Sequence, residues 1–152
     1  MKCLHATEED RIEIDLATQR LTYRSKKYRI SSSRYGTGTQ EGSNRTPLGL
    51  FQVADKIGAG DALYTQYKGR KPLAPWNMDR VSKEDIILSR ILRLSGLERK
   101  NVNTYSRYIY IHGTNDEEGI GDPRSIGCIR MHNREIMELF CEVPLGTVVK
   151  IY

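Results

Sequence analysis

The sequence has too few cysteines for disulfide bonds to hold the fold together. It contains only three, Cys3, Cys128 and Cys141, and a small odd number does not fit the paired framework of a secreted disulfide-rich domain. It also lacks the run of about 18 apolar residues that a membrane-spanning helix needs. These absences exclude a stapled scaffold and predict no membrane partner, so a hydrophobic core must hold the fold.

Charge of one sign is not concentrated anywhere in the chain. The net charge is +5 and the pI is about 9.2, but no run of five like charges occurs and basic residues mix with acidic ones. No motif typical of nucleic-acid binding accompanies the excess of positive charge. Nucleic acid is therefore not predicted as a partner, and an anionic small substrate accounts for the basic balance at least as well.

The first residues lack the apolar segment of a secretory signal. The chain turns acidic from Glu8 onwards, and no apolar stretch precedes Cys3 that would indicate lipid attachment. We therefore expect a cytoplasmic location, with a periplasmic location as the alternative if a leader was removed.

Strand signals dominate the chain, whose 152 residues suit one domain with one core. Apolar and polar residues alternate in several short segments, which is the period of half-buried strands. Strands are expected at residues 12–16, 21–24, 26–33, 50–53, 105–111 and 147–152. Residues 82–94 fit a capped helix or a strand, and their β-branched content favours a strand. Residues 54–77 are expected to form a long loop or a short hairpin.

One helix is expected, and it follows the turn that holds Cys128. Asn133 suits the N-cap of a helix over residues 134–142. Its apolar stripe is formed by Ile136, Met137, Leu139 and Phe140. The predicted fold class is therefore mainly β, a sandwich or barrel-like sheet, with one clear α-helix.

Two residues have the chemistry of a thiol nucleophile and its base. Cys128 lies in a glycine-containing turn, and His112 stands at the end of an expected strand. A free cysteine has a pKa near ~8.5, so it needs an imidazole within reach to become a good nucleophile at neutral pH. The sequence therefore predicts Cys128 as nucleophile and His112 as general base.

The neighbours of these two residues are predicted to support the reaction. Successive N–H groups of Ile126, Gly127 and Cys128 suit the oxyanion of a tetrahedral intermediate, and Ser125 is expected to hold the turn. Arg130 suits a substrate carboxylate because its guanidinium binds carboxylates through two hydrogen bonds. The residues expected at the substrate site are Tyr110, Gly113 and Arg130.

Each of these side chains also has a common structural role. An isolated cysteine is more often a small buried apolar residue than a nucleophile, and an isolated histidine is more often structural. A zinc site formed by His112, Cys128 and His132 is a further alternative, although a fourth ligand is missing. No metal and no cofactor is predicted.

A resemblance to a known family favours the catalytic interpretation. His112-Gly113-Thr114 followed by Ser125-Ile126-Gly127-Cys128-Ile129-Arg130-Met131 resembles the signature of the YkuD-type L,D-transpeptidase catalytic domain. The similarity extends to residues 12–16, 46–51 and 132–147, and it identifies residues 1–152 as a single domain of this type. Many members have histidine where this chain has Ile126.

The resemblance implies a reaction as well as a sandwich-like β fold. The expected reaction is acyl transfer through a cysteine thioester, at the bond between an L-centre, usually diaminopimelate, and D-alanine in peptidoglycan tetrapeptides. It implies Cys128 as nucleophile, His112 as base and the turn of Ile126, Gly127 and Cys128 as oxyanion site. The expected partner is a peptidoglycan stem tetrapeptide or muropeptide.

The resemblance does not fix the acyl acceptor. If water attacks the thioester, the enzyme is an L,D-carboxypeptidase of muropeptide recycling, and if an amine attacks, it is a transpeptidase that cross-links the wall. The first residues and the cysteine content favour the carboxypeptidase. A non-catalytic module that binds peptidoglycan fragments is a third hypothesis, against which the His112 and Cys128 pair counts.

Overall fold

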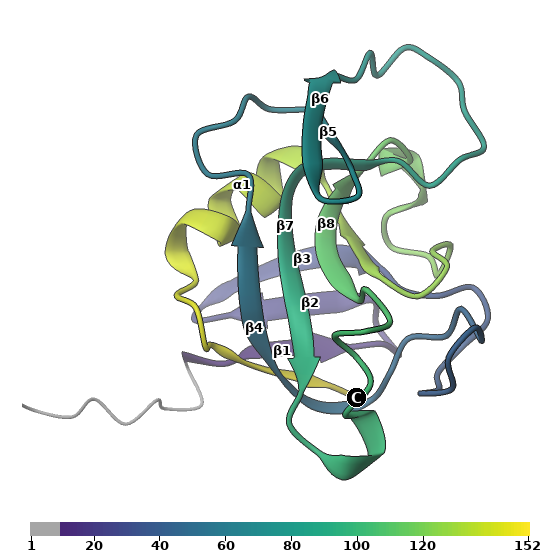
Figure 1. Ribbon diagram of the computed structural model, residues 1–152, viewed down its shortest axis with the longest axis vertical. Helices are drawn as coiled ribbons and strands as arrows, with labels where there is room; N and C mark the ends of the chain where they lie inside the picture. The colour runs from purple at the N-terminus through teal and green to yellow at the C-terminus, as the bar shows by residue number, and fades with distance from the viewer. Residues whose placement is uncertain (1–9) are drawn as a thin grey trace, which may run out of the picture.

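The computed structural model describes residues 10–152, which form ten strands, one α-helix and short 3-10 turns (Figure 1). The strands are β1 (Ile12–Asp15), β2 (Arg20–Tyr23), β3 (Lys26–Ser31), β4 (Gly49–Ile57), β5 (Thr65–Lys68), β6 (Lys71–Pro75), β7 (Ile87–Gly96), β8 (Tyr110–Thr114), β9 (Ile129–Met131) and β10 (Val148–Ile151). The helix α1 spans Asn133–Glu142, and the 3-10 turns are η2 (Arg99–Asn101) and η3 (Glu117–Gly119). The expectations for Cys3 and for the N-terminal segment fall on residues 1–9, outside the described part, and stay predictions.

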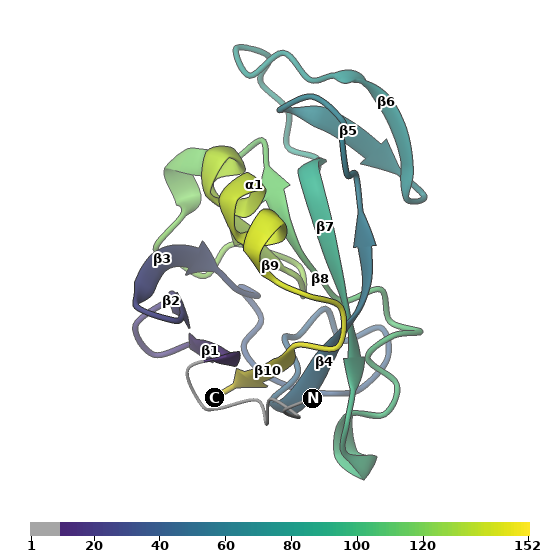
Figure 2. The same ribbon diagram turned by 90° about the vertical axis from the view of Figure 1, so that its left-hand side faces the viewer.

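The strands form one sheet that closes on itself. Its order is β4-β10-β1-β2-β3-β9-β8-β7-β5-β6, and an additional pairing of β4 with β7 joins the two sides. Eight strands therefore form a closed ring, while the β5–β6 hairpin extends outward from β7 (Figure 2). Closure leaves the ring without a free edge. The prediction of a mainly β, barrel-like fold is confirmed.

The alternation in the sequence explains which face of each strand is buried. In β1, Ile12 and Ile14 are fully buried while Glu13 and Asp15 are partly exposed. The strand β7 is buried along most of its length, because the barrel interior covers one face and the β5–β6 hairpin and α1 contact the rest. A main core and a smaller cluster beside it result, and each fully buried Ile or Leu in the main core contributes roughly 2–3 kcal/mol.

The helix α1 lies between the two halves of the barrel wall. Figure 2 shows it with β1, β2 and β3 on one side and β4 and β7 on the other. Its stripe of Ile136, Leu139 and Phe140 belongs to the main core. On the β3 side, Lys26 Nζ lies 2.5 Å from a Glu138 oxygen and 2.7 Å from a Glu142 oxygen.

Some expected boundaries are wrong, each for a visible reason. The strand expected at 105–111 begins only at Tyr110, because Thr104 to Tyr108 form turns and Tyr108 has φ +58°. The helix starts at Asn133 and its N-cap is His132, because the Asn133 side chain faces inward and donates to the Thr114 carbonyl (2.8 Å). In the segment 54–77, β4 continues to Ile57, and the short hairpin that was one of the two expectations follows as β5 and β6. No helix within residues 10–152 is long and apolar enough to cross a membrane.

Candidate active site

Two parallel strands bring the predicted nucleophile and base to one face of the sheet. In the register of β8 and β9, His112 pairs with Arg130 and Ile111 with Ile129. Cys128 immediately precedes β9, and its Sγ accepts a hydrogen bond from the Tyr110 N–H (3.3 Å). Since alternate residues of a strand point to the same face, the side chain of His112 leaves β8 on the face of Tyr110.

The turn that presents Cys128 is held by the side chain of Ser125. The buried Ser125 hydroxyl donates to the Cys128 carbonyl (2.6 Å) and accepts from the Gly127 N–H (3.2 Å). Gly127 has φ +131°, a conformation that residues with a side chain rarely adopt. Of the three turn N–H groups predicted as oxyanion donors, that of Gly127 is thus occupied, and those of Ile126 and Cys128 have no partner within residues 10–152.

A second hydroxyl fixes the direction of the Cys128 N–H. The fully buried Thr46 hydroxyl donates to the Gly127 carbonyl (2.9 Å) and accepts from the Ser33 N–H (3.0 Å). The Gly127 carbonyl and the Cys128 N–H belong to one planar trans peptide, so they point in opposite directions. By holding the carbonyl on the inner side, Thr46 directs the Cys128 N–H away from the barrel wall.

The contacts of His112 set its tautomer. The ring is fully buried, and Nδ1 lies 2.5 Å from the Gly113 carbonyl oxygen. A carbonyl only accepts, so Nδ1 carries the hydrogen and Nε2 of the neutral ring is left as an acceptor. Nε2 is buried and has no hydrogen-bond partner within the described residues. Burial lowers the pKa of His112, which keeps the ring neutral and able to take a proton near pH 7.

The thiol of Cys128 is protonated in this resting arrangement. Sγ lies 3.3 Å from the Tyr108 carbonyl oxygen, to which only S–H can donate. Desolvation, with a smaller contribution from the Asp85 charge, raises the pKa of Cys128 to about 12. Within residues 10–152 no hydrogen bond joins Sγ to His112 Nε2. Before a proton can be transferred, the S–H group must therefore break its hydrogen bond to the Tyr108 carbonyl and form one to Nε2 of His112.

These two pKa shifts predict the pH dependence of any reaction that needs the neutral pair. The lowered pKa of His112 places the acid limb of kcat/KM below pH ~6.5, the usual value for histidine. The raised pKa of Cys128, about 12, keeps the thiol protonated, so no alkaline limb is expected below that pKa. A pH profile of kcat/KM checks both limbs, and an acid limb above ~7 would contradict a buried neutral base.

The cleft beside the thiol has a volume of about 390 Å³ and carries both signs of charge. Arg107 lies in it, where its guanidinium donates to the carbonyls of Arg45 (2.8 Å) and Gly38 (3.3 Å). Burial lowers the pKa of Arg107 below its usual value, and the charges of the ionised form of Cys128 and of Glu41 only partly oppose this. Asp85 and Glu41 also line this cleft, as does the side chain of Ile126.

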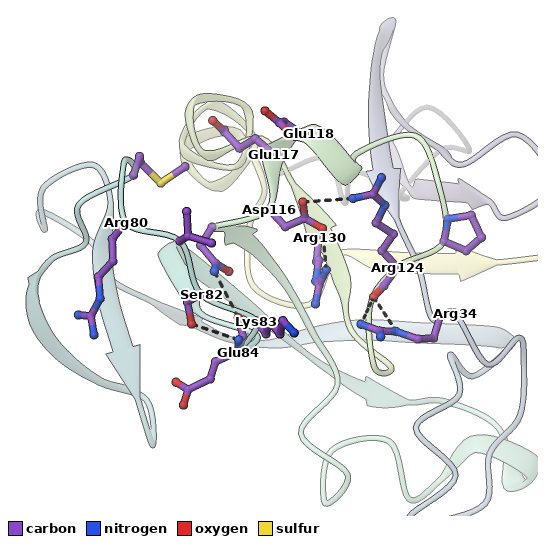
Figure 3. Close-up of a pocket in the computed structure, with 14 residues that line it drawn as sticks. Arg34, Arg80, Ser82, Lys83, Glu84, Asp116, Glu117, Glu118, Arg124 and Arg130 are labelled. Atoms are coloured by element: carbon purple, nitrogen blue, oxygen red, sulfur yellow. Dashed lines mark hydrogen bonds and ion pairs between the residues drawn. The ribbon is translucent and has the colours of Figure 1, made fainter.

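The structure places Arg130 differently from the sequence prediction. Its side chain is buried and is already paired, with Asp85 Oδ1 2.9 Å from Nη2 and Asp116 Oδ2 3.5 Å from Nη1. Figure 3 shows Asp116 between Arg130 and Arg124 in a larger cleft of about 830 Å³, which does not include Cys128. The cation that lines the cleft of the thiol is Arg107. The geometry therefore does not favour binding of a substrate carboxylate by Arg130.

Gly113 and Tyr110 also have packing roles. A Cβ on Gly113 would collide with Asn133 Oδ1 and with the Leu88 carbonyl, so only glycine fits this point of contact between β8, β7 and α1. Tyr110 is buried in a small cluster with Tyr67 and Ile91, against which Cys128 packs, and its hydroxyl accepts from Arg70 Nη1 (3.2 Å). Both residues shape the site, and neither is open to a substrate through its own side chain.

The comparison with known proteins names the family. The model of the YkuD family, described as the L,D-transpeptidase catalytic domain, matches residues 9–151. The chain belongs to this family. Its signature lies in the two segments that the structure brings together, the end of β8 and the turn before β9.

Relatives and solved structures of YkuD domains agree with this. YqjB of Bacillus subtilis (strain 168), an L,D-transpeptidase by name, is 54% identical over 117 residues, which are 77% of this chain and 57% of YqjB. The crystal structure of an L,D-transpeptidase from Xylanimonas cellulosilytica has a TM-score of 0.57 at 21% identity, over 93% of this chain and 59% of that one. The carbamoyl enzyme of Ldtfm with avibactam has a TM-score of 0.59 at 21% identity, over 96% and 49%. This chain thus spans 57% of YqjB, 59% of the Xylanimonas chain and 49% of the Ldtfm chain.

The zinc alternative has no support in the YkuD domain described here. His132 lies on the helix side of β9, where Nδ1 is 3.6 Å from Glu117 Oε2. Within residues 10–152 no group of three or more His, Cys, Asp and Glu side chains is placed to hold a metal ion.

Three residues of the site were not predicted from the sequence: Thr46, Asp85 and Arg107. Thr46 belongs to the segment 46–51 that resembles the family, but the residues around it in the sequence do not indicate that its hydroxyl holds the catalytic turn. The sequence around Asp85 is typical of a helix cap, and the alternation around Arg107 predicts a strand. Each acts through contacts distant in sequence, which no local pattern contains.

Loss of the Thr46 hydroxyl is expected to slow acylation without unfolding the domain. Thr46→Val keeps the shape but frees the Gly127 carbonyl, so the Cys128 N–H loses its fixed direction. Removing an oxyanion donor outright costs about 10²–10³ in kcat, so misdirecting one should cost ~10- to 100-fold. The measurement is the rate of acyl-enzyme formation, with Thr46→Ser as the control that keeps the hydroxyl. Equal rates for Thr46→Val and the parent would contradict this role.

Proposed function

We propose that this YkuD domain transfers the acyl group of a peptidoglycan stem tetrapeptide through a thioester on Cys128. The observation that carries the proposal is the combination of a thiol at a cleft with an N–H on the same residue and a buried imidazole Nε2, both of which have no hydrogen-bond partner among residues 10–152. A non-catalytic binding module would have no need for this combination. The scissile bond we propose joins the L-centre of the third residue to the terminal D-alanine.

The geometry supports a two-step reaction. In the first step Nε2 of His112 takes the thiol proton as Sγ bonds to the carbonyl carbon, and the Cys128 N–H stabilises the oxyanion. Collapse of the intermediate expels D-alanine, whose amine takes the proton from His112. The thioester that remains is open to a second nucleophile, whose proton His112 returns to Sγ.

The acceptor decides between two activities of the same thioester. An amine of a second stem peptide gives a cross-link, and the transpeptidase names of the relatives favour this acceptor. Attack by water hydrolyses the thioester, which is the activity of an L,D-carboxypeptidase of muropeptide recycling. The cysteine content of the sequence favours this activity, which stays a prediction. Both products follow from one acyl-enzyme, so one assay separates them.

The test is incubation with disaccharide-tetrapeptide, followed by mass analysis of the products. Loss of one alanine identifies hydrolysis, and a cross-linked dimer with loss of one alanine identifies transpeptidation. A substrate that is bound but returned unchanged by the parent would leave only the binding module.

A further inference from the structure

A carboxylate beside the thiol has one oxygen that no other residue between 10 and 152 uses. Asp85 lines the same cleft as Cys128, and its Oδ1 accepts from both Nε (3.1 Å) and Nη2 (2.9 Å) of Arg130. No hydrogen bond within residues 10–152 reaches its Oδ2. The side chain is 16% exposed and lines the cleft, so its carboxylate is within reach of a ligand that enters there.

The carboxylate is held rigidly, which a binding group requires. Arg130 is itself buried on β9 and paired on its far side with Asp116. Two hydrogen bonds from one planar guanidinium to the same oxygen hold Oδ1 of Asp85 in place and leave Oδ2 unused by Arg130. Little conformational entropy is therefore lost when Oδ2 binds a ligand.

The charges around the cleft determine which ligand fits. Arg107 is bonded to the carbonyls of the 38–45 loop, and the carboxylates in the cleft are Asp85 and Glu41. The Asp85 charge acts on both catalytic groups, since it partly opposes the lowering of the His112 pKa by burial and adds to the rise of the Cys128 pKa. A cation that enters beside the thiol therefore meets a fixed negative charge with a free acceptor.

We propose that Asp85 binds the ammonium group of an amine acceptor and so favours aminolysis of the Cys128 thioester over its hydrolysis. This inference rests on the proposed function and names the residue that receives its amine acceptor, a primary amine that is cationic in solution. Water gains nothing comparable from Oδ2, because it brings no positive charge.

The chemistry balances without any further reagent. The bound ammonium loses one proton to solvent and becomes the neutral amine. Its nitrogen bonds to the thioester carbonyl carbon, its second proton passes to His112 Nε2, and the C–S bond breaks. The proton on His112 then returns to Sγ, which leaves an amide and the free thiol.

The partition of the acyl-enzyme tests this proposal, because the ratio of products does not depend on how fast the thioester forms. The parent, Asp85→Asn and Asp116→Asn are incubated with tetrapeptide and propylamine, and the amide and the free acid are measured by mass. Asp116→Asn is the matched control, since it removes the other carboxylate from Arg130 and leaves Oδ2 of Asp85 in place. Hydroxylamine, uncharged at the assay pH, replaces propylamine in a parallel series.

We expect Asp85→Asn to lower the amide-to-acid ratio about tenfold or more with propylamine, the effect of one charge-assisted hydrogen bond. The ratio should stay unchanged with hydroxylamine, and Asp116→Asn should behave as the parent with both. An unchanged ratio in Asp85→Asn, an equal fall with hydroxylamine, or a rise only in the KM for the tetrapeptide would overturn the proposal.

Two further readouts keep the test decisive. If Asp85→Asn does not fold or acylate, the parent alone decides, because added salt should lower its ratio for propylamine and leave that for hydroxylamine unchanged. Equal responses of the two acceptors to salt would overturn the proposal. A parent that forms no thioester at all would instead refute the proposed function.

Discussion

Replacing Cys128 with alanine is expected to abolish turnover of the tetrapeptide, with a fall in kcat of at least about 10⁴-fold. The thiol is the atom that we propose bonds to the substrate, and nothing else in the cleft replaces it. Cys128→Ser should be nearly as inactive, because a serine hydroxyl is much less acidic than a thiol and His112 has a lowered pKa. Mass analysis of products after extended incubation measures the residual rate.

Cys141→Ala is the matched control for this substitution. Cys141 is the other free cysteine of the described part, and it is exposed on α1 rather than in the cleft. Its removal should leave the rate of the parent unchanged. Turnover by Cys128→Ala near the parent rate would refute the thioester mechanism, whatever the effect of Cys141→Ala.

Replacing His112 with alanine is expected to slow the reaction by about 10²- to 10⁴-fold, the usual contribution of a general base. The Cys128 thiol has a pKa raised to about 12, so very little thiolate forms at pH 7 without a base. Because the ring is fully buried, its removal leaves a cavity lined by the groups that held it. Added imidazole should therefore restore part of the rate, which a purely structural role would not allow.

His132→Ala serves as the control for the His112 variant. His132 caps α1 near the same turn, but it is partly exposed and its ring faces Glu117. It should change the melting temperature more than the rate per folded molecule. A loss in His112→Ala that is explained fully by unfolding, with no rescue by imidazole, would remove His112 from the mechanism.

The β-rich fold was predictable because the alternation of apolar and polar residues within each short segment indicates a strand and its buried face. The alternation of Ile12 and Ile14 with Glu13 and Asp15 already gives the buried face of β1. Gly127 also indicates a turn from the local sequence, and the structure shows it with φ +131°, a conformation that residues with a side chain rarely adopt. The closure of the ring by β4 and β7 joins segments about 40 residues apart and could be expected only from the fold class.

The contacts that orient the site could not be predicted in this way. The sequence around Arg130 indicates no partner for its side chain, and only the fold shows that Asp85 and Asp116 form ion pairs with its guanidinium. Asn133 had the identity of an N-cap, but its side chain is used for the Thr114 carbonyl and the Ser89 hydroxyl, so the helix starts one residue earlier. In each case a long-range polar contact overrides a local preference.

The central claim is that Cys128 carries the acyl group, and intact-mass analysis of the acid-quenched protein tests it most directly. After mixing with tetrapeptide, the account predicts a mass increase equal to the mass of the tetrapeptide minus that of the released D-alanine, because the thiol hydrogen leaves on the D-alanine amine. Peptide mapping should locate this increase on Cys128, and it should be absent in Cys128→Ala. Product formation without any adduct on the quenched parent, or an adduct on a different residue, would contradict the account.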